Sequence, residues 1–171
     1  MERIKPGQRF PQLSITCLDS RHKHLSDFLS RSFLLLVVYR GVQCSYCKQQ
    51  MQELDTLHHE FDQRDVQVLA MSMDTPEKAQ QAKLEWELEN LQIAYGLDIN
   101  AARQCGLYIS EATKESQMPL FSEPGIFLIR PDQTLYAAWI SSFPSPRPNL
   151  AEVIHAIDFI QTNNVPPRGA D

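Results

Sequence analysis

An uninterrupted apolar run, Phe33 to Tyr39, precedes two cysteines separated by two residues, Cys44 and Cys47. A short run that is apolar at every position is typical of a central strand covered on both faces. Beyond the cysteines, apolar residues recur at spacings of three and four, which predicts a helix from about Ser45 to Phe61. The sequence therefore places both thiols between the carboxyl end of a buried strand and the amino end of a helix.

The rest of the chain alternates strand and helix patterns. We expect strands at 10–18, 66–71, 91–95, 125–130 and 135–140, and helices at 26–29, 76–88, 99–105 and from about 150. Segment 108–124 has no clear period and is interpreted as a long surface loop. This order predicts an α/β fold with a central mixed β-sheet flanked by helices and an N-terminal β extension. The length suits a single domain, residues 1–165, with residues 166–171 expected to be a disordered tail.

Charge and hydropathy exclude several classes of function. The net charge is −5, and Lys and Arg do not cluster as a nucleic-acid-binding protein requires. No apolar run approaches the roughly 20 residues that span a bilayer, and the first residues lack a hydrophobic signal region. We therefore expect a soluble, cytoplasmic protein that binds neither nucleic acid nor membrane.

The Cys44–Cys47 pair suits two-electron redox chemistry. A helix amino terminus carries partial positive charge and free N–H groups, which stabilise a thiolate beside a second thiol. Cys17 and Cys105 lie among apolar residues and are interpreted as buried thiols. No cofactor and no metal site are expected, because a zinc site usually needs four ligands and His58 lies roughly 16 Å along the helix at ~1.5 Å per residue.

Three segments resemble the peroxiredoxin-like (AhpC/TSA, redoxin) branch of the thioredoxin-fold superfamily. They are Tyr39-Arg40-Gly41 with the Cys44–Cys47 motif, the stretch from Met73 to Glu77, and the stretch from Glu123 to Asp132. The resemblance extends from Pro6 to about Ile160. It implies a thioredoxin-like fold and a thiol-dependent oxidoreductase.

The resemblance leaves two assignments of the cysteines open. In a thioredoxin-like assignment Cys44 is the nucleophile, Cys47 resolves the mixed disulfide, and Pro124 is a cis-proline that faces them. In a peroxiredoxin-like assignment Cys47 attacks the peroxide and Cys44 resolves the sulfenic acid.

The second assignment departs from the family pattern at three positions. Arg40 stands where the pattern has Pro, and Cys44 stands where it has Thr. Pro124 lies near the position of the family's activating Arg, so Arg40 is a candidate electrostatic substitute. Gly41 and an exposed, substrate-facing Tyr46 complete the candidate supporting residues. The Pro-rich segment 143–149 is interpreted as a rigid connector, although similar chains carry an Arg-Pro segment there, which would place Phe143 or Arg147 at the border of the site.

The leading functional hypothesis is reduction of hydroperoxides by a CxxC dithiol/disulfide couple. The alternatives are thiol–disulfide exchange without peroxidase activity and a redox-sensing or metal-binding module. The implied partners are a hydroperoxide or disulfide substrate and an external thiol donor of the thioredoxin, glutaredoxin or glutathione type, with a homodimer as a further expectation.

Overall fold

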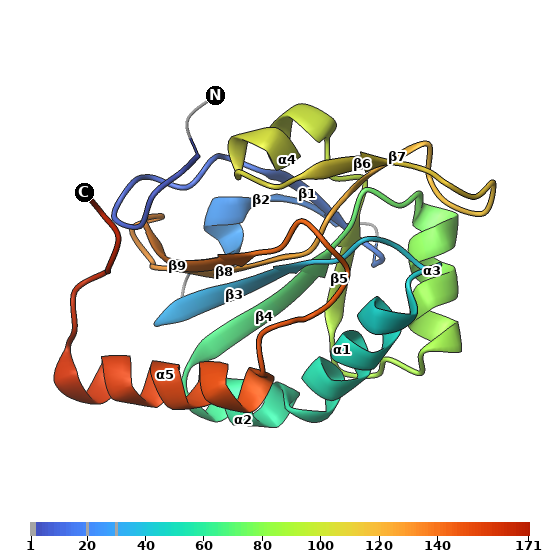
Figure 1. Cartoon of the computed structure of the whole chain (residues 1–171). Coiled ribbons are helices and arrows are strands. Elements are labelled where there is room, and N and C mark those ends of the chain that lie inside the picture. The colour runs from blue at the N-terminus through green and yellow to red at the C-terminus, as the bar shows by residue number, and fades with distance from the viewer. Residues whose placement is uncertain (1–2, 20, 30) are drawn as a thin grey trace.

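A computed structural model describes residues 3–19, 21–29 and 31–171 of the chain. Its centre is a mixed sheet of seven strands in the order β2-β1-β5-β4-β3-β8-β9, with β6 and β7 paired separately (Figure 1). The central strand β3 (Phe33–Val38) pairs in parallel with β4 (Val66–Met71) and antiparallel with β8 (Gly125–Ile129). The predicted α/β fold with a mixed central sheet is confirmed.

The bounds of the other elements follow the predicted order. The remaining strands are β1 (Ser14–Cys17), β2 (His22–His24), β5 (Gln92–Tyr95), β6 (Ile109–Glu111), β7 (Leu120–Ser122) and β9 (Leu135–Ile140). The helices are the 3-10 turn η1 (Leu25–Phe28), α1 (Ser45–Thr56), α2 (His58–Gln63), α3 (Pro76–Glu85), α4 (Ile99–Gln104) and α5 (Leu150–Asn163). The β1–β2 hairpin extends the sheet beyond β5 and forms the expected N-terminal β extension.

Two cores bury the two faces of the sheet. Alternate side chains of a strand point to opposite faces, so Leu35 and Val37 pack with α1, α2, α3 and α5, whereas Leu34 and Leu36 pack with η1, α4 and the N-terminal segment. Figure 1 shows α1, α2 and α5 below the sheet and α4 above it. This double burial explains why β3 is apolar at every position.

Two predictions of secondary structure are wrong. The helix expected from Ser45 to Phe61 is interrupted at Leu57, whose ψ of 1° departs from helical values and separates α1 from α2. Segment 108–124 contains the antiparallel pair β6–β7 instead of being loop throughout. Each of these two strands has only three residues, which is too short for a detectable alternation.

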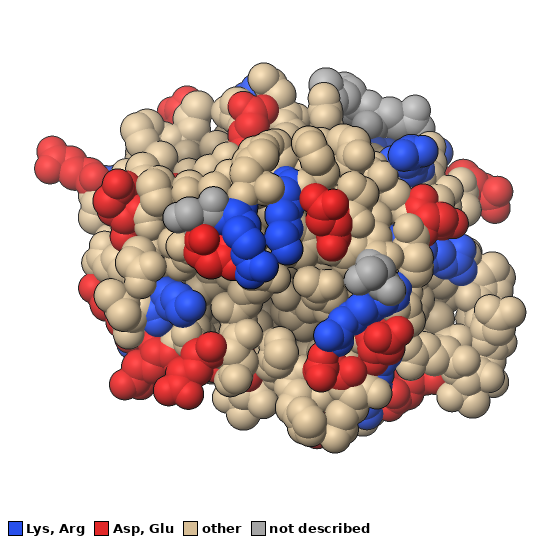
Figure 2. Space-filling model, turned by 180° about the vertical axis from the view of Figure 1, so that it is seen from behind, with Lys and Arg blue, Asp and Glu red and all other residues tan. Residues whose placement is uncertain are grey.

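The outer surface carries charges of both signs. On the face shown in Figure 2, acidic and basic side chains lie next to one another in several places, with uncharged residues between these groups. Among the described helices, none is long and apolar enough to cross a membrane.

Candidate active site

The two cysteines lie at the amino end of α1, immediately beyond the carboxyl end of β3. Cys44 is the N-cap of α1, and its Sγ accepts the backbone N–H of Cys47 at 3.2 Å. Cys47 lies in the first helical turn and is completely buried, whereas Cys44 retains 6% of its surface. The N-cap position therefore directs one sulfur toward the free N–H groups of the helix, where a negative charge is stabilised.

Arg147 reaches this pair from the loop that precedes α5. Its Nη2 atom lies 3.1 Å from Cys47 Sγ and 3.7 Å from Cys44 Sγ. The same guanidinium donates to Gln50 Oε1 at 2.6 Å and to the carbonyl oxygen of Pro144 at 2.7 Å. The interpretation of segment 143–149 as only a connector is wrong, because this segment supplies a cation that contacts both sulfurs.

Arg40 contributes to the site through both its backbone and its side chain. Its backbone N–H donates to Cys47 Sγ at 3.3 Å. Its guanidinium pairs with Glu123, with Nε 3.0 Å from Oε2, and lies 4.8 Å above the ring of Phe121. Arg40 is thus fixed on one side by a carboxylate and on the other by an aromatic face.

Gly41 gives the connection between β3 and α1 its shape. Its φ of +141° is unfavourable for residues with a side chain, and a Cβ at this position would lie 2.8 Å from Asp74 Oδ1. Asp74 is buried and accepts the backbone N–H of Val42 at 2.9 Å through Oδ2. Asp74 therefore holds the loop from β3 to α1 in contact with the loop that follows β4.

The two thiols have opposite shifts in pKa. Hydrogen bonding from the Cys47 side chain is the largest cause that lowers the pKa of Cys44 to about 5, aided by the Cys47 backbone N–H and the guanidiniums of Arg40 and Arg147. Burial and the neighbouring Cys44 raise the pKa of Cys47 well above its ordinary value. The reduced pair consequently holds one negative charge at neutral pH, centred on Cys44.

A surface hollow of about 260 Å³ opens beside Cys44. Its lining includes Arg40, Cys44, Asp74, Lys78, Met118 and Phe121, but not Cys47. A molecule that enters from solvent by this route meets the sulfur that carries the charge.

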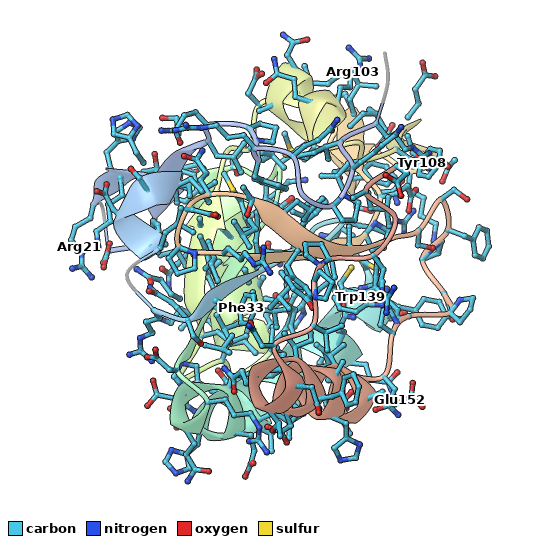
Figure 3. The ribbon with its side chains drawn as sticks, turned by 90° about the vertical axis from the view of Figure 1, so that its left-hand side faces the viewer. Arg21, Phe33, Arg103, Tyr108, Trp139 and Glu152 are labelled. Carbon is cyan, nitrogen blue, oxygen red and sulfur yellow. The ribbon has the colours of Figure 1, made fainter. Side chains whose placement is uncertain are left out.

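The predicted cis form of Pro124 is wrong. The bond between Glu123 and Pro124 is trans, and within the described residues the cis peptide bond is Ser145–Pro146. Pro124 lines a second cavity, of about 580 Å³, together with Trp139 and Arg147. Figure 3 shows Trp139 on the side of the sheet that faces α5. Pro124 is therefore connected with the site through the cavity that Arg147 borders.

Tyr46 is 48% exposed, and it lines a groove with residues 145–149. The two remaining cysteines, Cys17 and Cys105, are buried, and burial raises the pKa of each. In the described part of the chain, no three His, Cys, Asp or Glu side chains gather as a metal ion would require.

The fold matches that of solved peroxiredoxin structures. The peroxidoxin BcpB of Mycobacterium tuberculosis is 16% identical, with 92% of this chain and 99% of that chain covered and a TM-score of 0.75. A mutant PrxQ of Xylella fastidiosa is 19% identical, with 96% and 100% covered and a TM-score of 0.71. A yeast mitochondrial 1-Cys peroxiredoxin is 19% identical, with 96% of this chain and 78% of that chain covered and a TM-score of 0.75. Its structure is described as the basis of a thiol-resolving mechanism via glutathione/thioredoxin systems.

The AhpC/TSA family model matches residues 6–138, so the chain belongs to the AhpC/TSA family. Comparison with curated proteins gives no match. The match confirms the predicted family and supports the predicted activity, thiol-dependent reduction of peroxides by an oxidoreductase. Arg147 lies outside the matched range, and the only signal for it in the sequence was the Arg-Pro segment of similar chains.

Proposed function

We propose that Cys44 and Cys47 form the redox couple of this peroxidase and that Cys44 attacks the hydroperoxide. The observation that carries the proposal is that Cys44, and not Cys47, lines the hollow that opens to solvent, and its pKa is lowered to about 5. The thiolate, not the thiol, is the nucleophile in such chemistry. At neutral pH a pKa of about 5 keeps Cys44 almost completely ionised.

In the first step the Cys44 thiolate attacks the terminal oxygen of the hydroperoxide. A sulfur–oxygen bond forms, the oxygen–oxygen bond breaks, and the other oxygen leaves as an alkoxide or hydroxide that takes a proton from solvent. Cys44 becomes a sulfenic acid. The guanidiniums of Arg147 and Arg40, which lie at the sulfurs, stabilise the negative charge that develops on the leaving oxygen.

In the second step Cys47 closes the disulfide. Once Cys44 is a neutral sulfenic acid, one cause of the raised pKa of Cys47, its charged neighbour, is gone. Cys47 Sγ then faces the Arg147 guanidinium at 3.1 Å and the Arg40 N–H at 3.3 Å, both of which favour its thiolate. This thiolate attacks Cys44 Sγ, hydroxide leaves and is protonated to water, and the disulfide protects Cys44 from further oxidation.

An external thiol completes the cycle. It attacks the sulfur of Cys44 to form a mixed disulfide, and Cys47 leaves as a thiolate held by the same two donors. A second donor thiol then attacks the donor's sulfur in the mixed disulfide and releases Cys44 as a thiolate, so that two donor thiols become one disulfide. A donor of the thioredoxin, glutaredoxin or glutathione type supplies the electrons, as expected from the sequence and in keeping with the glutathione/thioredoxin systems described for the yeast relative. A cytoplasmic location suits the four free thiols, because a reducing compartment keeps cysteines unpaired.

The family pattern favours the opposite order, because Cys47 occupies the position of its peroxide-attacking cysteine. Trapping of sulfenic acid after peroxide treatment distinguishes the two orders. We expect a sulfenate on Cys44 in the Cys47→Ser variant. A sulfenate that forms on Cys47 in the Cys44→Ser variant, with none in the Cys47→Ser variant, would reverse the order of the steps.

The same variants test the alternative functions. Absence of sulfenate in both variants, together with insulin-disulfide reduction by the wild type, would favour thiol–disulfide exchange without peroxidase activity. Stoichiometric zinc or copper that is lost on replacement of either cysteine would favour a metal-binding module.

A further inference from the structure

Glu123 is a buried carboxylate with no part in the steps above. It lies between β7 and β8 and is only 4% exposed. Its Oε1 accepts the hydroxyl of Ser110 at 2.8 Å, and its backbone N–H donates to the carbonyl oxygen of Tyr108 at 2.8 Å. Strand β6 therefore holds the carboxylate of Glu123, and Tyr108, the residue just before β6, holds its backbone.

The partner of Glu123 is Arg40, whose guanidinium also acts on the thiolate. Arg40 belongs to the loop between β3 and α1 and lines the same hollow as Cys44, whose pKa its side chain lowers. Glu123 Oε2 lies 3.0 Å from the Nε of Arg40. Phe121 of β7 covers the guanidinium face at 4.8 Å. The guanidinium of Arg40 is thus shared between the carboxylate of Glu123 and the reacting sulfur of Cys44.

We propose that Glu123 is a positioning residue for the proposed peroxidase reaction. Its side chain holds the Arg40 guanidinium at the dithiol, and its negative charge limits how strongly Arg40 attracts the thiolate. The proposal rests on the proposed role of Cys44 as nucleophile. The β6–β7 pair would then anchor the Arg40 guanidinium through Glu123, although neither strand contacts a cysteine sulfur in the described structure.

Several other groups also act on Cys44, and they come from every side of the site. They are Cys47 on α1 and Arg147 on the loop before α5, while the charged side chains of Asp74 and Lys78 line the hollow beside Cys44. Glu123 differs from them because it contacts Cys44 only through Arg40. A change at Glu123 therefore leaves the direct contacts of the sulfur in place.

Two substitutions separate the charge of Glu123 from its anchoring role. Glu123→Gln keeps an acceptor oxygen for Ser110 and Arg40 but removes the charge. We expect the ionisation of Cys44 to move to lower pH by about half a unit or more, because the positive charge of Arg40 is no longer offset. Glu123→Ala also removes the anchor, so we expect its kcat/KM for hydrogen peroxide at pH 7 to lie about tenfold below that of Glu123→Gln.

Ionisation is measured from the pH dependence of alkylation by iodoacetamide in a Cys47→Ser background, without peroxide. This readout is independent of peroxidase activity, so a failure of the proposed function does not mimic a failure of this proposal. The matched control is Asp158→Asn on α5, which removes a carboxylate that pairs with Arg64 at the surface. We expect this variant to leave the ionisation of Cys44 unchanged.

The charge role would be overturned if adding Glu123→Gln to the Cys47→Ser variant left the ionisation curve of Cys44 unchanged or moved it to higher pH. Equal kcat/KM values for Glu123→Gln and Glu123→Ala would overturn the anchoring role. If the Gln variant does not fold, Ser110→Ala tests the anchor instead, since it leaves every charge in place and removes one donor to Glu123. We expect that variant to lose kcat/KM as well, and an unchanged value would contradict the proposal.

Discussion

Arg147 Nη2 lies 3.1 Å from Cys47 Sγ, although the two residues are 100 positions apart in the sequence. The contact joins the beginning of α1 to the loop before α5, two segments that are far apart in the sequence but cover the same face of the sheet. The cation also reaches Cys44 Sγ, at 3.7 Å. Arg147 can therefore follow the negative charge as it passes from one sulfur to the other.

Replacement of Arg147 by Met should slow the reaction with peroxide. We expect kcat/KM for hydrogen peroxide to fall by about two orders of magnitude, because the variant loses the donor that faces both the thiolate and the leaving oxygen. Arg147→Lys should recover only part of the loss, since a lysine cannot bond Gln50, Pro144 and the sulfurs together. Stopped-flow kinetics of both variants would measure this, and full activity of Arg147→Met would contradict the proposed role.

The rate of Cys44 alkylation should depend on pH in a simple way. Because the folded protein lowers the pKa of Cys44 to about 5, the thiolate is present above this pH and is lost as the pH falls through it. We expect a rate that is constant from about pH 6.5 to 8 and decreases about tenfold per unit well below pH 5. A midpoint near the ordinary cysteine value of about 8.5 would contradict the electrostatic account of the site.

Gly41→Ala should destabilise the protein more than Gly96→Ala. Both glycines have positive φ, +141° and +68°, but a Cβ at Gly41 would also meet Asp74, whereas nothing lies within 4 Å at Gly96. We expect losses in the free energy of unfolding of about 3 kcal/mol and about 1 kcal/mol respectively. Urea unfolding of the two variants provides the comparison, and equal losses would show that the contact with Asp74 is not the cause.

Asp55→Ala should loosen the attachment of α1 to the segment before β5. The Asp55 carboxylate accepts the backbone N–H groups of Glu89, Asn90 and Leu91 at 3.3, 2.8 and 2.9 Å. Loss of these charge-assisted bonds should cost about 2 kcal/mol in the free energy of unfolding. Glu53→Ala, on the same helix, is a suitable control, and a loss no larger than that of the control would argue against the role of these bonds.

Local patterns in the sequence were sufficient to predict the dithiol and its setting. The apolar run of β3, the turn at Gly41 and the two cysteines are close together in the chain, so the strand-to-helix geometry follows from a few residues. The same applies to α3, whose start at Pro76 with Thr75 as its cap agrees with the structure. Predictions of this kind depend on short-range rules of strand, turn and helix formation.

The parts that the sequence did not reveal depend on contacts between distant segments. Arg147 lies in a loop without periodicity, and only the packing of α5 against the sheet brings it to Cys47. The partnership of Arg40 with Glu123 spans 83 positions and requires the β6–β7 pair, whose strands are too short to recognise. The expected cis form of Pro124 came from the resemblance alone, and the structure contradicts it.

The two halves of the site are attached to parts of the molecule that differ in how readily they open. The cysteines follow β3, which is paired on both edges and buried on both faces, so its amides should exchange with solvent only when the whole domain unfolds. Arg147 lies on a loop outside the strands and helices, so we expect this loop to separate from the sheet at a lower free energy. A partial opening would therefore leave the thiols in position without their cation, and the protein would lose its reactivity toward peroxide before it lost its fold.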